Sequence, residues 1–127
     1  MSYTCNAPDL VKKWRSLVND SVMMGRDSAL IKKQLTEGVT PAQILFGMYQ
    51  YEGERTITIP QFLSQMDEWL VEPAEEAEIE LACCMSKTTP PEYYIWQDYR
   101  FEQTSYGYQQ ARDAKRKVQI WASKVLA

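Results

Sequence analysis

The sequence predicts an all-α fold, a single compact domain of about six or seven short helices that spans residues 1–127. Apolar residues recur with the 3.6-residue helical period almost throughout the chain, and glycines and prolines interrupt that period at intervals typical of short helices. With 127 residues, 45% of them hydrophobic and 24% charged, the chain can form one core but is too short for two domains of ordinary size.

The first two helices are expected over residues 8–24 and 28–37. In the first, Leu10, Trp14 and Val18 share one face at helical spacing, and Gly25 follows its end. Asp27 is expected to cap the second helix, because a short acidic side chain can accept a hydrogen bond from the free backbone N–H groups there.

A clear helix boundary lies in QLTEGVTPAQILFGMYQ, residues 34–50. Gly38 is placed to stop one helix, Thr40 to cap the next, and Pro41 to take its first position. The helix that follows, residues 41–51, is apolar on most of its sides, which predicts a central position in the fold.

Four further helices are expected over residues 59–71, 73–86, 91–104 and 106–126. Pro60 and Pro73 open the first two of these, and the stretch KTTPP ends the second, because residues before proline avoid the helical region. Before them, EGERTITI breaks the helical period at Gly53 and alternates briefly, which allows a short extended segment.

The composition argues against catalysis. The chain has no histidine, which removes the commonest general base and metal ligand. Cys5, Cys83 and Cys84 form no disulfide framework, and the adjacent pair is interpreted as two small buried hydrophobes. No phosphate loop or metal-ligand spacing is present. We therefore expect a non-enzymatic protein without cofactor or metal and, since no signal sequence or membrane span is visible, a cytoplasmic one.

The helix, tight turn and helix of residues 34–51 invite comparison with a helix-turn-helix DNA-binding unit. The next helix would then enter the major groove, but Pro60 to Val71 carries Asp67 and Glu68 and no lysine or arginine. A helix between phosphates normally brings cations to them, and the connection before this helix is longer than the usual turn. The stretch is interpreted as an ordinary helical corner, with DNA binding kept as an alternative.

A set of turn and packing residues comprises Gly38, Val39, Thr40, Gln43, Ile44, Gly47 and Met48, followed by Pro60 and Phe62. This set resembles the phage replication P proteins, the lambda-type helicase loaders. The similarity covers a third to a half of the chain, which is much shorter than typical members. It implies a non-enzymatic adaptor that binds a hexameric replicative helicase and brings it to an origin of DNA replication.

Charge is unevenly distributed along the chain. Residues 41–87 hold nine acidic side chains and two cations, while the segments before and after them each hold six cations and four acids. The acids gather at Glu72, Glu75, Glu76, Glu78 and Glu80. Carboxylates four residues apart repel each other on a helix, so something should offset them. Two interpretations stay open: a solvated face balanced by the basic last helix of the same chain, or a surface for a basic partner.

The last helix carries a basic cluster at Arg112, Lys115, Arg116 and Lys117. One interpretation is a solvated face, supported by an Asp113–Lys117 pair one helical turn apart. The alternative is contact with the phosphates of a nucleic acid, although the patch is small for a chain with a net charge of −3.

Aromatic residues are concentrated between residues 93 and 108, at Tyr93, Tyr94, Trp96, Tyr99, Phe101, Tyr106 and Tyr108. At 100° per residue these positions cannot all lie on one helix face, so some are buried on a second side or exposed. Aromatic residues with a nearby arginine, here Arg100, are typical of protein interfaces, and they also stack on unpaired bases. Core packing, a protein interface and base stacking all remain open.

Together these features predict a small helical protein-interaction module, in concrete form a phage or mobile-element replication adaptor that binds a replicative helicase. The expected partner-binding residues are Tyr93, Tyr94, Trp96, Tyr99, Arg100, Phe101, Glu72, Glu75, Glu76 and Glu80. One alternative is an acidic DNA-mimic inhibitor of a nucleic-acid-binding protein. Another is a DNA-binding protein that uses a helix-turn-helix-like unit or the C-terminal basic helix. A homodimer is compatible with the surplus of aromatic residues.

Overall fold

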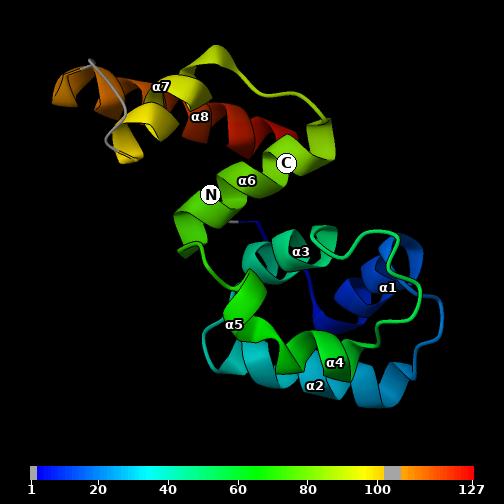
Figure 1. The fold of residues 1–127 in the computed structure, drawn as a ribbon. Helices are drawn as coiled ribbons and strands as arrows, with labels where there is room; N and C mark the ends of the chain where they lie inside the picture. Colours follow the sequence, from blue (N-terminus) through cyan, green and yellow to red (C-terminus); the bar gives the residue numbers. More distant parts are fainter. Residues whose placement is uncertain (1–2, 102–106) are drawn as a thin grey trace.

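A computed structural model of the protein describes residues 3–101 and 107–127, and within these ranges the chain folds into eight helices and no strand (Figure 1). The all-α prediction is confirmed, with one helix more than the six or seven expected. The helices are α1 (Ala7–Leu17), α2 (Met24–Thr36), α3 (Pro41–Tyr49), α4 (Ile59–Ser64), α5 (Met66–Trp69), α6 (Ala74–Ser86), α7 (Pro91–Arg100) and α8 (Tyr108–Leu126).

The boundary between α2 and α3 is the one predicted from the sequence. Gly38 has a φ of 105°, and the N–H groups of Gly38 and Val39 donate to the carbonyls of Leu35 and Gln34, which closes the end of α2. Thr40 then caps α3, because its hydroxyl accepts from the N–H of Gln43 while the Gln43 side chain accepts from the N–H of Thr40.

The first helix ends seven residues earlier than expected, at Leu17 rather than residue 24. Asn19 leaves the helical path because its side-chain amide donates to the carbonyl of Ile57 at 2.9 Å, a contact with the loop before α4. The second helix consequently begins at Met24, four residues before the predicted start. Asp27 lies inside its first turn and accepts from the N–H of Met23 instead of standing at the cap position.

The helix predicted over residues 59–71 is interrupted at Gln65, which separates α4 from α5. The interruption turns Trp69 back over α4, where its indole N–H donates to the carbonyl of Phe62 and the two rings stack with centroids 4.2 Å apart. The EGERTITI stretch is a series of turns closed by local backbone hydrogen bonds, not an extended segment.

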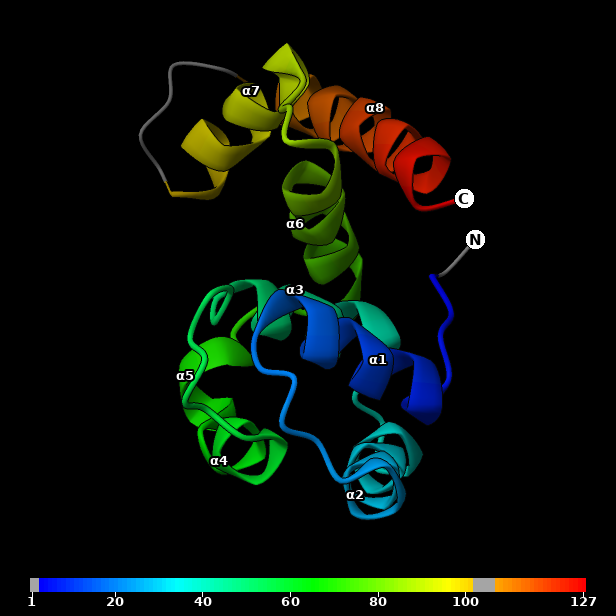
Figure 2. The ribbon, with the colours of Figure 1, turned by 90° about the vertical axis from the view of Figure 1, so that its right-hand side faces the viewer.

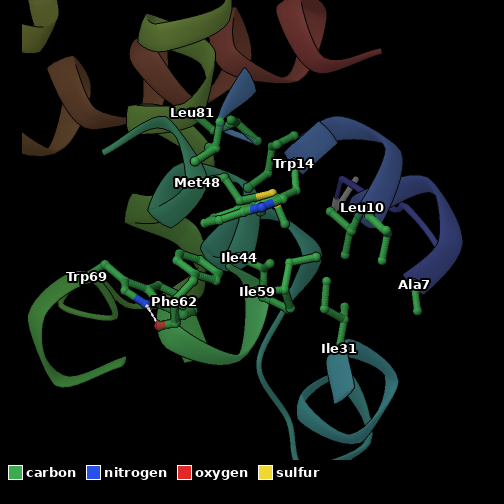
Figure 3. Close-up of a cluster of buried hydrophobic side chains, with 14 residues drawn as sticks. Ala7, Leu10, Trp14, Ile31, Ile44, Met48, Ile59, Phe62, Trp69 and Leu81 are labelled. Atoms are coloured by element: carbon green, nitrogen blue, oxygen red, sulfur yellow. Dashed lines mark hydrogen bonds between the residues drawn. The ribbon is translucent and has the colours of Figure 1, made fainter. Parts of the chain in front are cut away.

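The interior consists of two hydrophobic clusters that share α6. The larger lies among the first five helices and includes Trp14, Met48 and Phe62, with Leu81 reaching into it from α6 (Figure 3). The smaller lies where α6 meets α7 and α8, around Ile79 and Trp96. Because α6 stands between the α1–α5 bundle and the α7–α8 hairpin, it sets where the hairpin sits (Figure 2).

Helix α3 occupies the central position that its apolar composition predicts. Five of its nine residues are buried, and it packs against both α1 and α6. The other four residues are partly buried, so no residue of α3 is fully exposed.

Candidate interaction surface

The aromatic segment divides between the interior and the surface. On α7, Trp96 is only 4% exposed and packs in the smaller core, and Tyr93 is half-buried against it with ring centroids 6.0 Å apart. Tyr94 on the same helix is exposed. Tyr106 lies outside the described residues. The sequence expectation that these side chains cannot share one face is therefore confirmed, and the structure separates those that pack from those that face outward.

Three exposed aromatic side chains gather where α7 ends and α8 begins, and we call them the aromatic end of the hairpin: Tyr99, Phe101 and Tyr108. Their exposed fractions are 36%, 61% and 63%. The rings of Tyr99 and Tyr108 lie 6.2 Å apart, which joins the two helices at this point. The end of the hairpin projects away from the α1–α5 bundle (Figure 1).

Two arginines lie over the rings of the aromatic end. The Arg112 guanidinium is 5.8 Å from the Tyr108 ring, and that of Arg100 is 5.4 Å from the Phe101 ring and 4.8 Å from the Trp96 ring. Such contacts hold flexible arginines in defined positions. The exposed Arg112 adds positive charge to the aromatic end, whereas Arg100 is paired with Glu72.

The carboxylates of α6, and that of Glu72 two residues before it, contact other parts of the chain. Glu72 forms an ion pair with Arg100 at 2.7 Å, and Glu76 pairs with Lys115 at 3.1 Å. Glu75, which is exposed, lies 3.8 Å from the same lysine. The structure thus supplies an intramolecular offset to the repulsion along α6, partly from the basic last helix as one interpretation expected. Glu78 also contacts the chain, since it accepts from the backbone N–H of Tyr3.

Glu80 belongs to a polar network between α6 and α7 that the sequence did not indicate. Its Oε1 accepts from the Tyr93 hydroxyl at 2.7 Å and from the Gln97 amide at 2.9 Å. Burial raises the pKa of Glu80 above its ordinary value of 4.5, although the Tyr93 hydrogen bond opposes the shift. Burial, with Glu80 adding to it, also raises the pKa of Tyr93. The sequence shows only that Gln97 lies one helical turn after Tyr93. Its contact with Glu80 could not be predicted without knowing that α7 packs against the acidic helix α6.

The raised pKa of Glu80 predicts a pH dependence of stability. The folded chain holds this proton more tightly than the unfolded chain, so the contribution of Glu80 is complete below its unfolded pKa and is lost as the pH rises through the folded pKa. Glu80→Gln keeps an oxygen acceptor for Tyr93 but does not titrate. Its free energy of unfolding relative to wild type should therefore rise as the pH increases above the ordinary carboxyl pKa of 4.5. Urea unfolding across that range measures the difference, and a constant difference would contradict the prediction.

The basic cluster of α8 is split by the same contacts. Lys115 turns inward to Glu76 and lies 5.8 Å from the Trp96 ring, whereas Arg112, Arg116 and Lys117 are exposed. The expected Asp113–Lys117 ion pair is not among those formed by the described residues, and Asp113 instead accepts from the Gln109 amide at 3.1 Å. Exposed cations therefore continue along α8 from the aromatic end.

The segment that a helix-turn-helix unit would present to DNA lacks cations in the structure as in the sequence. On α4 and α5 the exposed side chains are Gln61, Ser64, Asp67 and Glu68. Negative charge there would repel a phosphate backbone.

The cysteines of α6 are poorly suited to nucleophilic chemistry. Cys83 and Cys84 are half-buried, less buried than the sequence interpretation expected, and burial raises the pKa of the Cys83 thiol to about 11 and that of Cys84 in the same direction. Both thiols stay protonated near neutral pH. Within residues 3–101 and 107–127 no three potential metal ligands gather in one place, and no helix is long and apolar enough to cross a membrane.

Comparison of the chain with protein-family models, with curated proteins and with solved structures gave no match. The function proposed below is therefore based on the exposed residues of the α7–α8 hairpin.

Proposed function

We propose that this protein is a non-enzymatic helical adaptor that binds another protein through the aromatic end of its α7–α8 hairpin. The observation that carries the proposal is the exposure of Tyr99, Phe101 and Tyr108 at one end of the hairpin, where the Tyr99 and Tyr108 rings lie together and arginines lie over the rings of Phe101 and Tyr108. Tyrosine and arginine are, with tryptophan, enriched among the residues that dominate binding energy in protein interfaces.

The concrete form of the proposal is a replication adaptor of a phage or mobile element whose partner is a hexameric replicative helicase. Support for this partner comes from the resemblance of residues 38–62 to the phage replication P proteins. Those residues lie in the α1–α5 bundle, where Gly47 and Phe62 are buried, so they would maintain the scaffold while the hairpin makes contact.

The other candidate functions have less support. A DNA-mimic inhibitor needs a row of available carboxylates, but Glu72, Glu76 and Glu80 are engaged by side chains of α7 and α8. Recognition of duplex DNA by the unit around residues 34–71 would need a cationic exposed helix there. The exposed cations of α8 keep a nucleic-acid partner as an outcome that the experiments must distinguish.

The test is the binding of a purified bacterial replicative helicase to the immobilised chain, together with capture of proteins from a bacterial lysate. The triple variant Tyr99→Ala, Phe101→Ala, Tyr108→Ala should weaken binding of the specific partner at least about tenfold, since hot-spot residues contribute about 2 kcal/mol each. Circular dichroism should show unchanged helix content, because none of the three side chains belongs to either hydrophobic cluster. Trp96 is unsuitable for this test because its burial would confound binding with stability.

Met23→Ala provides the control, since Met23 is 59% exposed but lies in the loop between α1 and α2. It should leave binding unchanged. A partner captured equally by wild type and by the triple variant would overturn the proposed site. Capture of a different protein, with no binding to helicase, would contradict the proposal that the partner is a replicative helicase. The proposal that the chain is an adaptor would remain.

A further inference from the structure

The outer side of α8 carries further exposed cationic and apolar side chains next to the aromatic end. The buried positions of this helix are Ala111, Ala114, Val118 and Ala122, and the residues on the opposite side are exposed. Among these, Arg112, Arg116 and Ile120 follow Tyr108 at intervals of four residues. We call these four residues the outer stripe. At 1.5 Å per residue the stripe is about 18 Å long.

The outer stripe is positively charged and contains an apolar position. The exposed cations of α8 are Arg112, Arg116, Lys117 and Lys124, against the single carboxylate of Asp113. None of these four forms an ion pair with a carboxylate of the described residues. Ile120 is 52% exposed between the cations. Burial of this apolar side chain against a partner would be favourable, because it would remove hydrophobic surface from water.

The inner side of the same hairpin packs against an acidic segment of the same chain, residues 72–80. Glu72, Glu76 and Glu80 recur every fourth residue in and just before α6, and each contacts a side chain of α7 or α8. Two apolar residues of the same helix, Ile79 and Ala82, pack in the smaller core. The hairpin thus binds a helix that combines carboxylates one turn apart with apolar side chains.

We infer that the outer stripe binds an acidic amphipathic helix of the partner protein. This inference rests on the proposed adaptor function and names the partner's surface. Arg112 and Arg116 are one turn, about 6 Å, apart, which matches carboxylates at positions i and i+4 of a docked helix. Tyr108 and Ile120 flank the two cations and provide the apolar contacts. A stripe of this length takes about twelve helical residues.

A short acidic helix fits the surroundings better than a long polyanion. The stripe is cationic over one helix, but residues 41–87 of the same chain hold nine acids against two cations and would repel an extended phosphate backbone. A second copy of this chain cannot offer its α6, because that helix is buried against its own hairpin.

The experiment measures the binding of fluorescent peptides to the full chain by anisotropy. One probe is a helical peptide of about fourteen residues with glutamates at i and i+4 and leucines between them, and a second has glutamine at every glutamate. The acidic peptide should bind at least tenfold more tightly than the neutral one. Arg112→Glu with Arg116→Glu should weaken its binding at least tenfold, and so should raised salt.

Arg15→Glu with Lys33→Glu is the matched control, since both cations are exposed on α1 and α2 and the net charge changes by the same amount. This control should retain the affinity. Equal binding of both peptides, or of neither, would overturn the inference. So would preferential binding of a single-stranded dT oligonucleotide, or a wild-type dimer that Arg112→Glu with Arg116→Glu converts to a monomer.

Failure of this inference and failure of the proposed function give different results. If the captured partner is lost in the triple aromatic variant but kept by Arg112→Glu with Arg116→Glu, the adaptor stands and the outer stripe is not its contact. If neither set of substitutions affects capture, the proposed function fails as well.

Discussion

Gly47→Ala is expected to destabilise the protein by about 3 kcal/mol, at the upper end of the usual range for overpacking a core. Gly47 lies on the buried side of α3, directly against the indole of Trp69. A Cβ atom at this position would fall 2.7 Å from Cδ2 of that ring and closer still to its neighbour. A shift of the ring would disturb its stacking on Phe62 and the hydrogen bond from its N–H to the Phe62 carbonyl.

Equilibrium urea unfolding followed by circular dichroism measures this loss, and Gly25→Ala is the matched control. Gly25 lies in the first turn of α2 with nothing within 4 Å of an added Cβ. Alanine there should be neutral or stabilise the chain by up to about 1 kcal/mol, since it favours the helix. A Gly47→Ala chain as stable as wild type would mean that Trp69 is not held against α3.

Trp14→Ala should be still more disruptive, with a loss of about 3–5 kcal/mol, the usual range for removing a buried tryptophan. Trp14 is 0% exposed at the centre of the larger core, with its ring centroid 4.9 Å from that of Phe62 and 6.5 Å from that of Tyr51 (Figure 3). Its removal leaves a cavity that the surrounding helices α1, α3 and α4 cannot close without losing their own contacts.

Replacement by phenylalanine separates packing from hydrogen bonding at the two tryptophans of the larger core, Trp14 and Trp69. The indole N–H of Trp14 has no hydrogen-bond partner among the described residues, so Trp14→Phe loses contact area but no hydrogen bond. Trp69→Phe also loses the bond to the Phe62 carbonyl. It should cost about 1 kcal/mol more than Trp14→Phe. Thermal and urea unfolding of the pair test this, and the reverse order would contradict the assigned hydrogen bonds.

Local sequence signals predicted the architecture wherever neighbouring residues determine the structure. Gly38, Thr40 and Pro41 placed the boundary between α2 and α3 correctly, because glycine reaches the left-handed conformation, threonine caps within three residues and proline needs no N–H at the first helical turn. The same holds for the central position of α3, since a helix that is apolar all round must be buried.

Contacts between distant residues decided what the local signals could not. Asn19 ends the first helix region early because it bonds to Ile57, a residue 38 positions away. The break at Gln65 is favoured by the stacking of Trp69 on Phe62, which a straight helix would not allow. Helical period alone carries no information about such contacts.

For this protein, then, the order of amino acids determined the helical class, most helix starts and the concentration of aromatic and charged residues. Only the tertiary structure decided which of those residues remain available: it buried Trp96, joined Glu72 and Glu76 to Arg100 and Lys115, and left Tyr99, Phe101, Tyr108 and Arg112 exposed. The physical reason is that capping and periodicity act within one or two helical turns, whereas exposure depends on which helices pack together.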